Sequence, residues 1–402
     1  SMSNRDAVIV SMARSPIGDF GGSLAPLRAY QLASQVLSAV IEKSGIDTNI
    51  IDDVILGDCV QSPDEANTAR TVMLAAGLPD HVPAVTIQRQ CSSAMQALAM
   101  AATYIKAGEY DVVVAGGVES MSNAPYVLPS ARWGARLQHG QMMDAMWEML
   151  HSGSNLLEGK GKGYIMGQTA ENLARKYNIP RQEQDVIALR SHQNAEAAIK
   201  GGKFKDEIIP IQVPQRKGDP KIVDTDEHVR MGIKMEDLAR LKPVFAKDGS
   251  VTAGNASGLN DGAAICLVMS REKAKELGLT PIAKIISVAA AGCDPKLMGW
   301  GPVPSTEKLL KKTGVKLDDI QLIELNEAFA AQYLACEQGL GLNREITNVN
   351  GSGVGLGHPV GCTGARIVIS LINEMKRRGN TLGLATLCVG GGMGMSTLIE
   401  VE

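Results

Sequence analysis

The sequence predicts an α/β protein made of two similar halves, with a mainly parallel central sheet and an insertion between the halves. Three observations support this prediction. Apolar β-branched runs alternate with helical stretches, their order repeats later in the chain, and residues 121–250 differ in composition from both flanks. A chain of 402 residues is also longer than one hydrophobic core usually organises.

The first half begins with a strand, a loop rich in glycine and an amphipathic helix near residues 29–44. A second strand is expected at 52–60 and a helix near 65–76. The short run "AVTI" (84–87) is a third strand, a helix follows Cys91, and "DVVVAGG" (111–117) is a strand that ends in glycines.

The second half repeats this order. Residues 281–292 resemble 6–18, residues 314–330 resemble 45–60, and residues 379–392 resemble 108–117. Three similar segments in the same order, all with nearly the same offset, indicate an internal duplication. Two packed copies of one unit would bring their equivalent loops face to face.

Residues 121–250 contain a segment rich in methionine and tryptophan (142–150), the stretch "EGKGKGYIMG", a helical run at 169–200 and a polar stretch to about 230. We interpret this region as an insertion that grows out of the first half. Long insertions often carry binding functions. A stabilising cap or a subunit contact is the alternative at this stage.

Composition excludes several classes of protein. Apolar residues make up 45% of the chain and charged residues 21%, and the net charge is −3. This near-neutral balance argues against nucleic acid or an anionic membrane as the main partner. The seven cysteines are odd in number and form no CxxC pair, and no run of 18 apolar residues occurs. We therefore expect a cytoplasmic protein with reduced thiols and no membrane partner.

Cys91 follows a polar Gln-Arg-Gln run and precedes a predicted helix. Unpaired N–H groups and the helix dipole stabilise a thiolate at such a position and lower its pKa. Ser92 and Ser93 suit a helix start. A small apolar core residue is the alternative interpretation of Cys91.

Two segments are dense in glycine, residues 348–366 and 388–396. Neither has the spacing of a dinucleotide-binding or P-loop motif. His358 lies between glycine and proline 267 residues after Cys91, at the matching place in the second repeat. The duplication would therefore pair a cysteine nucleophile with a histidine base, although a lone histidine is usually structural.

Two further residues stand near these loops. Cys388 ends an apolar strand before three glycines, where a second thiol suits proton transfer to and from carbon. Asn326 follows the strand at 320–325 and could donate a hydrogen bond to an oxyanion or hold a water. Glu327 beside it is either part of the site or a solvated charge at the end of the strand.

With these segments assembled, the sequence resembles the thiolase family over nearly its whole length. The resemblance rests on eight segments in the family's order: "RQCSSAMQA", "AGGVESMSNAPY", "MGQTAENLA", "TAGNASGLNDGAA", "DPKLMGWGPVPS", "NEAFA", "GHPVGCTGAR" and "CVGGGMG". It implies a thiolase fold of two duplicated five-layered αβαβα half-domains plus an inserted loop domain. Residues 1–120 with 251–272 would form one half, 273–402 the other, and 121–250 the loop domain that covers coenzyme A and mediates tetramer contacts.

The resemblance also implies a reaction, the reversible condensation of two acetyl-CoA molecules to acetoacetyl-CoA and CoA. His358 would take the proton from Cys91, which becomes acetylated, and Cys388 would then remove an α-proton from a second acetyl-CoA. One oxyanion site would use His358 and a water held by Asn326. The other would use the N–H groups of Cys91 and Gly390.

For coenzyme A, the family pattern implies Arg230 at the adenine-pyrophosphate end and Ser257 near the pantetheine. The tunnel between them would be lined by Met166, Ala253, Phe245, Ala328, Phe329 and Met298. The implied partners are acetyl-CoA, acetoacetyl-CoA and CoA, with no prosthetic group and no metal. The implied assembly is a homotetramer, a dimer of dimers.

The chain departs from the family pattern at two places. Ile165 stands where the acetyl-CoA enzymes often have histidine, which bears on the acyl-length preference. Ser352 replaces a glycine, and Gly353 and Gly355 replace alanines in the glycine loop. Three alternatives stay open: a degradative 3-ketoacyl-CoA thiolase with a longer acyl pocket, a decarboxylating ketoacyl synthase, and a non-catalytic acyl-CoA or lipid-binding relative.

Overall fold

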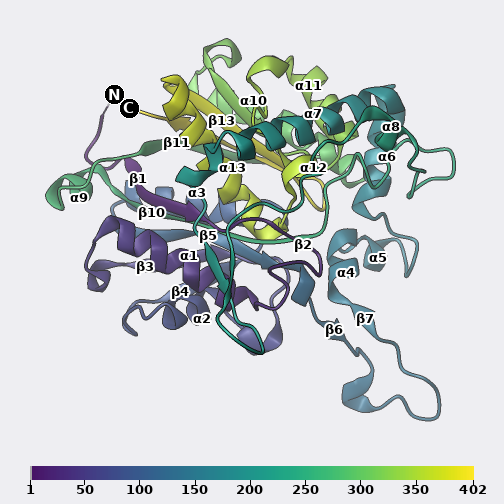
Figure 1. Cartoon of the computed structure of the whole chain (residues 1–402), viewed down its shortest axis with the longest axis horizontal. Coiled ribbons are helices and arrows are strands. Elements are labelled where there is room, and N and C mark those ends of the chain that lie inside the picture. The colour runs from purple at the N-terminus through teal and green to yellow at the C-terminus, as the bar shows by residue number, and fades with distance from the viewer. Residues whose placement is uncertain (1) are drawn as a thin grey trace.

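A single mixed sheet runs through the computed structural model, which describes residues 2–402 (Figure 1). Its strand order is β12-β13-β14-β11-β1-β10-β5-β3-β4, and the short β2 (Gly18–Asp19) pairs with β10. The first half contributes β1 (Ala7–Arg14), β3 (Asp53–Gly57), β4 (Ala84–Ile87), β5 (Val112–Ser120) and β10 (Asn260–Ser270). The second half contributes β11 (Ala283–Gly292), β12 (Leu322–Leu325), β13 (Leu382–Val389) and β14 (Met393–Glu400).

The two halves meet where β1 pairs with β11, with Val8 opposite Lys284. Outward from this junction the order is β1-β10-β5-β3 on one side and β11-β14-β13-β12 on the other. The strands predicted as repeats therefore occupy matching places: β1 with β11, β3 with β12, and β5 with β13. The duplication expected from the sequence is confirmed.

The prediction of a mainly parallel sheet is wrong. Only β3 with β4, β3 with β5, and β12 with β13 are parallel, and the other strand pairs are antiparallel. The cause is one return strand in each half. β14 turns back on β13 through the three glycines 390–392, and β10 returns beside β5 after the insertion. A tight turn can join only antiparallel strands, since a parallel pair needs a longer crossover.

Helices cover the sheet in layers (Figure 1). The helices α1 (Ala29–Ser44) and α2 (Thr68–Ala75) share a core with one face of the first half. In the middle, α3 (Ser93–Lys106) and α13 (Val360–Arg378) pack against each other, and α10 (Pro302–Thr313) and α11 (Ala330–Leu340) lie beyond the second half. The five layers thus belong to the two halves jointly, whereas the sequence suggested five layers in each half.

Alternating side chains explain why strands of the first half are buried on both faces. Val112 and Val114 on β5 join the core with α1 and α2, and their neighbour Val113 joins the core with α3 and α13. Successive residues of a strand point to opposite faces, so a continuous apolar run is needed in a strand covered on both sides. The central helices are held in this way at a fixed position between the two halves of the sheet.

The insertion forms helices and two short ribbons outside the main sheet. The helical run predicted at 169–200 is two helices, α6 (Met166–Lys176) and α7 (Arg181–Lys200), separated by a turn in which Asn178 has a φ of 52° before Pro180. The ribbons are β6 (Tyr126–Val127) with β7 (Met143–Asp144), and β8 (Ile211–Val213) with β9 (Lys221–Val223). Shorter helices complete the chain: α4 (Ala145–His151), α5 (Ser154–Leu157), α8 (Met235–Ala239), α9 (Arg271–Glu276) and α12 (Gly353–Leu356).

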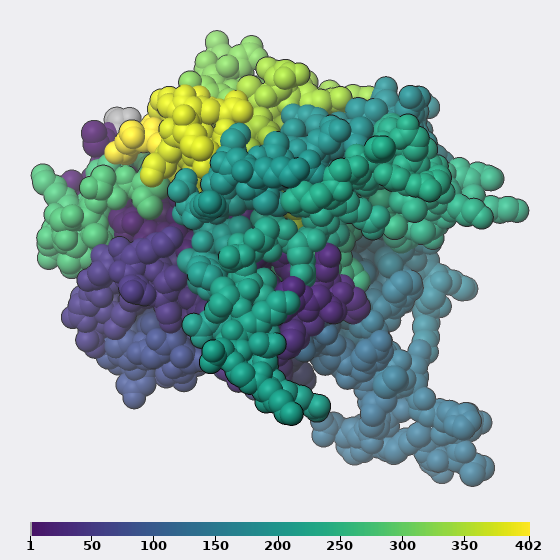
Figure 2. Space-filling view, viewed as in Figure 1, coloured from purple at the N-terminus to yellow at the C-terminus, as the bar shows by residue number. Residues whose placement is uncertain are grey.

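The segment between β6 and β7 projects from the body of the molecule as an arm, seen at the lower right of Figure 2. Large apolar side chains on this arm are exposed, among them Trp133 at 86% and Leu137 at 99%. Within residues 2–402, no helix is long and apolar enough to cross a membrane.

Candidate active site

Cys91 lies immediately before the first turn of the central helix α3 and is 2% exposed. The preceding Gln90 has a φ of 47°, a left-handed conformation that non-glycine residues rarely adopt. Burial raises the pKa of Cys91 to about 11, although the N–H groups of Gly390 and Cys91 donate to its sulfur and oppose this rise. The expected lowering of the Cys91 pKa by the helix start is therefore wrong, because desolvation of the thiolate outweighs those donors.

Gly390 brings its N–H to the Cys91 sulfur from the turn between β13 and β14. A Cβ atom there would lie 2.5 Å from Cε of Met166 and 2.5 Å from Oγ of Ser152. Glycine at this position leaves room for the side chains of Met166 and Ser152 beside the turn between β13 and β14. Two N–H groups, those of Cys91 and Gly390, thus point at one atom in a buried site.

His358 occupies the matching place in the second half, just before α13. Its Nδ1 lies 2.6 Å from Oγ1 of Thr363, one helical turn further on. The Thr363 hydroxyl donates to the carbonyl oxygen of Pro359 at 3.0 Å, so its oxygen is left to accept a proton from Nδ1. This arrangement fixes the tautomer with the proton on Nδ1 and leaves Nε2 as the basic nitrogen.

Nε2 of His358 is buried and has no hydrogen-bond partner among the residues that the structure describes. Burial, with a contribution from the charge on Arg366, lowers the pKa of His358 to about 3. At neutral pH the site therefore holds a neutral imidazole beside a neutral Cys91 thiol. Asn260 fixes the loop, since its Oδ1 accepts the backbone N–H of His358 at 2.8 Å.

Cys388 and Asn326 also lie in the interior. Cys388 is fully buried near the end of β13, and desolvation, together with the thiols of Cys91, Cys336 and Cys293, raises its pKa well above the usual range. Asn326 follows β12, and neither its side-chain nitrogen nor its oxygen has a protein partner in the described part of the chain. A buried amide without partners is costly, so its presence points to a functional role.

One cavity of about 120 Å³ brings most of the predicted residues together. Those lining it are Cys91, His358, Met166, Ser257, Phe245, Ala328, Phe329 and Met298. The wall is largely apolar, and the rings of Phe245 and Phe329 meet edge to face with centroids 6.4 Å apart. Arg230 and Ala253 lie outside this cavity on the surface. In residues 2–402, no cluster of three or more His, Cys, Asp or Glu side chains is arranged to hold a metal ion.

Comparison with known proteins now identifies the family. A model of the thiolase N-terminal domain matches residues 7–272, and one of the thiolase C-terminal domain matches residues 279–401. The chain belongs to the thiolase family. An acetyl-CoA acetyltransferase of Pseudomonas aeruginosa is 50% identical over 392 residues, which cover 98% of either chain. One of Cupriavidus necator is 48% identical over 400 residues, 98% of this chain and 99% of that one.

Two solved structures resemble this thiolase closely. The Bacillus anthracis acetyl-CoA acetyltransferase superposes with a TM-score of 0.95 at 55% identity, covering 99% of each chain. Human mitochondrial 3-ketoacyl-CoA thiolase superposes with a TM-score of 0.94 at 40% identity, covering 99% of this chain and 100% of that one. The thiolase fold expected from the sequence is confirmed.

The glycine loop of this thiolase packs closely against α7 and against the segment that follows β12. A Cβ atom at Gly353 would lie 2.2 Å from the carbonyl oxygen of Glu327, and one at Gly355 would lie 2.6 Å from that of Ser191. The Ser191 hydroxyl accepts the N–H groups of Ser352 and Gly355 and donates to Glu327. Gly355 therefore allows α7 to contact the loop that carries His358, and Gly353 allows this loop to contact the segment after β12 that contains Glu327.

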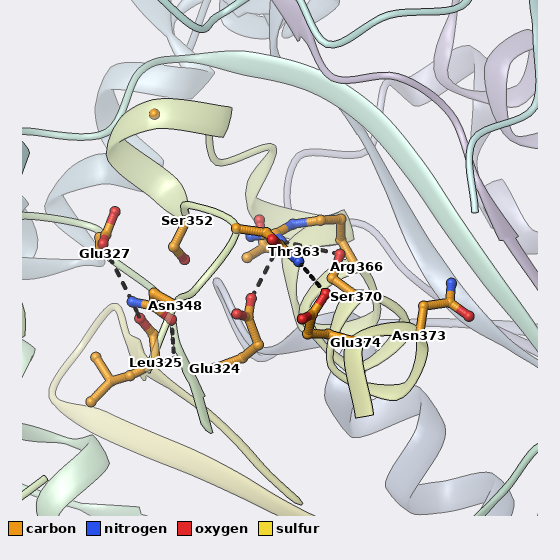
Figure 3. Close-up of polar contacts among 12 residues, drawn as sticks. Glu324, Leu325, Glu327, Asn348, Ser352, Thr363, Arg366, Ser370, Asn373 and Glu374 are labelled. Carbon is orange, nitrogen blue, oxygen red and sulfur yellow. Dashed lines mark hydrogen bonds and ion pairs between the residues drawn. The ribbon is translucent and has the colours of Figure 1, made fainter. Parts of the chain in front are cut away.

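A cluster of buried polar side chains lies next to this loop (Figure 3). Asn348 donates to Leu325 and Glu327, and Arg366 lies 3.6 Å from Glu324 beside Ser370. Glu327 is buried and is held by Ser191, so it is not the solvated charge that the sequence left open. The group supports the strand end from which Asn326 projects.

Sequence reasoning missed Thr363 and Asn260, which orient His358, and Leu150, which lines the cavity. Thr363 could have been predicted from the sequence, because it lies in the first turn of the helix that follows His358 and is therefore close to the His358 ring. Asn260 and Leu150 come from a distant strand and from the insertion, and no local pattern marks them.

Proposed function

We propose that this thiolase is an acetyl-CoA C-acetyltransferase that condenses two acetyl-CoA molecules to acetoacetyl-CoA and CoA, and catalyses thiolysis in reverse. The observation that carries the proposal is the convergence of the two central helix starts. Cys91 and His358 line one cavity, and two backbone N–H groups point at the Cys91 sulfur. The acetyl-CoA acetyltransferases among its relatives support the choice of substrate.

In the first half-reaction, Nε2 of His358 accepts the Cys91 proton as the sulfur attacks the acetyl carbonyl of acetyl-CoA. The CoA sulfur takes the proton of Cys388 as it leaves, so free CoA departs as a thiol, an acetyl group remains on the Cys91 sulfur, and Cys388 is left as a thiolate. The resting thiol is neutral, so the thiolate is generated only when a base removes its proton. The N–H groups of Cys91 and Gly390 then stabilise the oxyanion, and such preorganised donors typically contribute about 3–4 kcal/mol each.

In the second half-reaction, the Cys388 thiolate removes an α-proton from a second acetyl-CoA, and the carbanion attacks the acetyl group on Cys91. The bond to the Cys91 sulfur then breaks, and this sulfur takes back the proton held by His358. The enolate oxygen would be stabilised by His358 and a water on Asn326. The buried amide of Asn326, which lacks a protein partner, supports this assignment. The Cys91 and Gly390 N–H groups act again on the oxyanion formed at the acetyl group.

For coenzyme A, we assign Met166, Phe245, Ala328, Phe329 and Met298 to the pantetheine tunnel, and Ser257 to a polar contact along it. Their position along the catalytic cavity supports these roles. Arg230 and Ala253 belong further out, at the adenine and phosphate end, and the exposure of both residues suits contact with the part of the ligand that stays near solvent. Coenzyme A thioesters are the substrates, and the proposal requires no prosthetic group.

We also propose a homotetramer in the cytoplasm, with residues 121–250 as the loop domain that covers coenzyme A and supplies subunit contacts. The exposed apolar side chains of the arm support an interface, because large exposed apolar patches usually mark binding surfaces. All seven cysteines are free, which suits a reducing compartment.

Thiolysis of acetoacetyl-CoA by CoA tests the function. The wild-type protein should form acetyl-CoA, and the Cys91→Ala and His358→Ala variants should lose this activity while retaining the fold. An inactive wild-type protein would refute the proposal. A non-catalytic acyl-CoA binder is distinguished by alkylation: iodoacetamide should label Cys91 first, and acetyl-CoA should protect it, whereas uniform slow labelling of all seven cysteines would favour the binder.

A further inference from the structure

Two buried carboxyl groups of the first half lie beside the start of α13. Glu119 is near the end of β5, Asp58 follows β3, and each is 1% exposed. Neither carboxyl lines the catalytic cavity, and neither takes part in the two half-reactions. Because burying an acid is costly, the hydrogen bonds that hold this pair indicate what the pair does.

Glu119 holds the first turn of α13. Its Oε1 accepts the N–H of Gly361 at 3.0 Å. The residue at the N-cap position of α13 is Pro359, whose side chain accepts no hydrogen bond. The other half of the molecule therefore supplies the cap, and a carboxylate is favourable at a helix N-terminus. His358 directly precedes this turn, and its partner Thr363 lies within it, so the cap fixes the place of the imidazole.

The same carboxyl group holds a segment that contacts the residue before Cys91. Its Oε1 accepts the N–H of Cys59 at 2.8 Å, and its Oε2 accepts that of Val60 at 3.1 Å. The Cys59 thiol donates in turn to the carbonyl oxygen of Gln90 at 3.0 Å. Gln90 has the left-handed backbone that leads into Cys91. One carboxyl group is thus connected to the backbone on both sides of the reacting pair.

Asp58 shares a proton with Glu119. Oδ2 of Asp58 accepts the hydroxyl of Thr68 at 2.7 Å, whereas Oδ1 has no donor among the described residues and the carboxyl meets that of Glu119. Two carboxylates in contact repel strongly in a buried site, so the pair retains one proton. Glu119 has three N–H donors and is the carboxylate. Burial, together with the charge of Glu119, holds the pKa of Asp58 well above its usual range.

We propose that Glu119 is a positioning residue of the thiolase reaction, with Asp58 as the donor of a shared proton that keeps the Glu119 carboxylate in place. Glu119 holds the start of α13 and the segment beside Gln90 so that Nε2 of His358 can take the Cys91 proton. This inference rests on the proposed thiolase reaction and adds to it a group that does not touch the substrate.

The principal test is Glu119→Gln. Glutamine has nearly the same shape, but it lacks the charge and can no longer accept N–H groups on both sides of its terminal group. We expect kcat for acetoacetyl-CoA thiolysis to fall by about tenfold to a hundredfold, because small displacements of reacting groups have effects of this size. KM should stay within about twofold of wild type, because the carboxyl group does not line the cavity.

Three further variants serve as controls. Asp58→Asn retains a donor to Glu119, as the protonated acid does, and should keep kcat within about threefold of wild type. Asp58→Ala lacks this donor and should lose at least about fivefold. Glu65→Gln makes the same chemical change at another buried carboxyl, whose Oε1 accepts the N–H of Tyr30 at the start of α1. It should keep kcat within about twofold of wild type.

Alkylation of Cys91 by iodoacetamide separates positioning from a general loss of stability and requires no turnover. Near pH 7, where Cys91 needs His358 as its base, Glu119→Gln should react about tenfold more slowly than wild type. At high pH it should react at least as fast, because the Glu119 charge that contributes to raising the Cys91 pKa is gone. A merely destabilised protein would react faster at both pH values. The variant leaves in place the other titratable groups around Glu119, which are Asp58, Cys59 and Cys362.

The inference fails if Glu119→Gln retains wild-type kcat, if it loses no more than Glu65→Gln, or if its alkylation is faster at both pH values. Equal losses in Asp58→Asn and Asp58→Ala would also overturn it, and this pair decides alone if Glu119→Gln does not fold. A wild-type protein that cleaves no acetoacetyl-CoA would refute the proposed function instead, and the alkylation rates would still test the role of Glu119.

Discussion

Replacing Thr363 by valine removes the hydroxyl that holds Nδ1 of His358 and retains nearly the same volume. In the wild-type site that hydroxyl lies 2.6 Å from Nδ1, is fully buried, and donates its own proton to Pro359. Without this hydroxyl, the Nδ1–H group of His358 loses its acceptor in a buried site, where solvent water does not replace the lost hydrogen bond. An unsatisfied buried donor costs about 1–3 kcal/mol.

The imidazole can avoid this cost only by moving its proton to Nε2 or by rotating. Either change removes the basic nitrogen from the side of Cys91. A penalty of about 1.4 kcal/mol corresponds to tenfold in rate, so kcat/KM for thiolysis should fall by about tenfold to a hundredfold in Thr363→Val. Thr363→Ser retains the hydroxyl and should stay within about threefold of wild type.

The assay is kcat/KM for acetoacetyl-CoA thiolysis, together with the rate at which iodoacetamide alkylates Cys91 as a function of pH. Near neutral pH the variant should be alkylated more slowly, because Cys91 depends on His358 for its deprotonation. As the pH approaches the Cys91 pKa of about 11, the thiolate forms without a base and the two rates should converge. Wild-type activity in Thr363→Val, or equal losses in the serine and valine variants, would refute the tautomer argument.

Two other predictions concern buried acids. Cys388→Ser should still form acetyl-enzyme but lose condensation by about a hundredfold or more, measured by intact mass and by acetoacetyl-CoA formation; wild-type condensation would exclude the role of Cys388. Burial, opposed by Arg366, raises the pKa of Glu324 to about 8 from its ordinary value of 4.5, so the native state retains a proton that the unfolded state releases. The free energy of unfolding should therefore fall as pH rises from 4.5 to 8, by at most about 1.4 kcal/mol per pH unit from this group. In urea unfolding, Glu324→Gln should show a smaller loss between pH 5 and 8, and an identical loss in both proteins would contradict the assignment.

Much of the fold could be predicted from local patterns. The helix expected at 29–44 is α1, the run "AVTI" is β4, and the three repeated strand pairs occupy matching places in the sheet. The repeat also predicted that Cys91 and His358 lie at equivalent loops, and both precede a central helix. These features depend on periodicity and order, which a sequence displays directly.

Strand direction and electrostatics could not be predicted in this way. The return strands β10 and β14 have the same apolar composition as parallel ones, so the mixed sheet was not evident. Burial of Cys91 between the two halves raises its pKa, and this effect outweighs the lowering that was expected from the start of the helix. Asn260 reaches His358 from a position 98 residues away, and only the folded chain reveals such a partner.

The tight contact of α7 with the glycine loop was visible only as an unexplained departure from the family pattern. Glycine at 353 and 355 suggested a change in backbone stiffness, whereas the structure shows that both positions pack too closely against the carbonyl oxygens of Glu327 and Ser191 to leave room for a Cβ atom. The sequence shows that glycine stands at these two positions. It does not show which residues occupy the space that a side chain would fill, because those residues come from distant parts of the chain.

The central claim is that Cys91 carries the acyl group, and its most direct test is the mass of the protein after brief incubation with acetyl-CoA alone. We predict a gain of one acetyl group, located by peptide mapping on Cys91, which is removed when CoA is added. The Cys91→Ala variant should gain none. Acetylation of any other cysteine, or an unmodified wild-type protein that still forms acetoacetyl-CoA, would contradict the account.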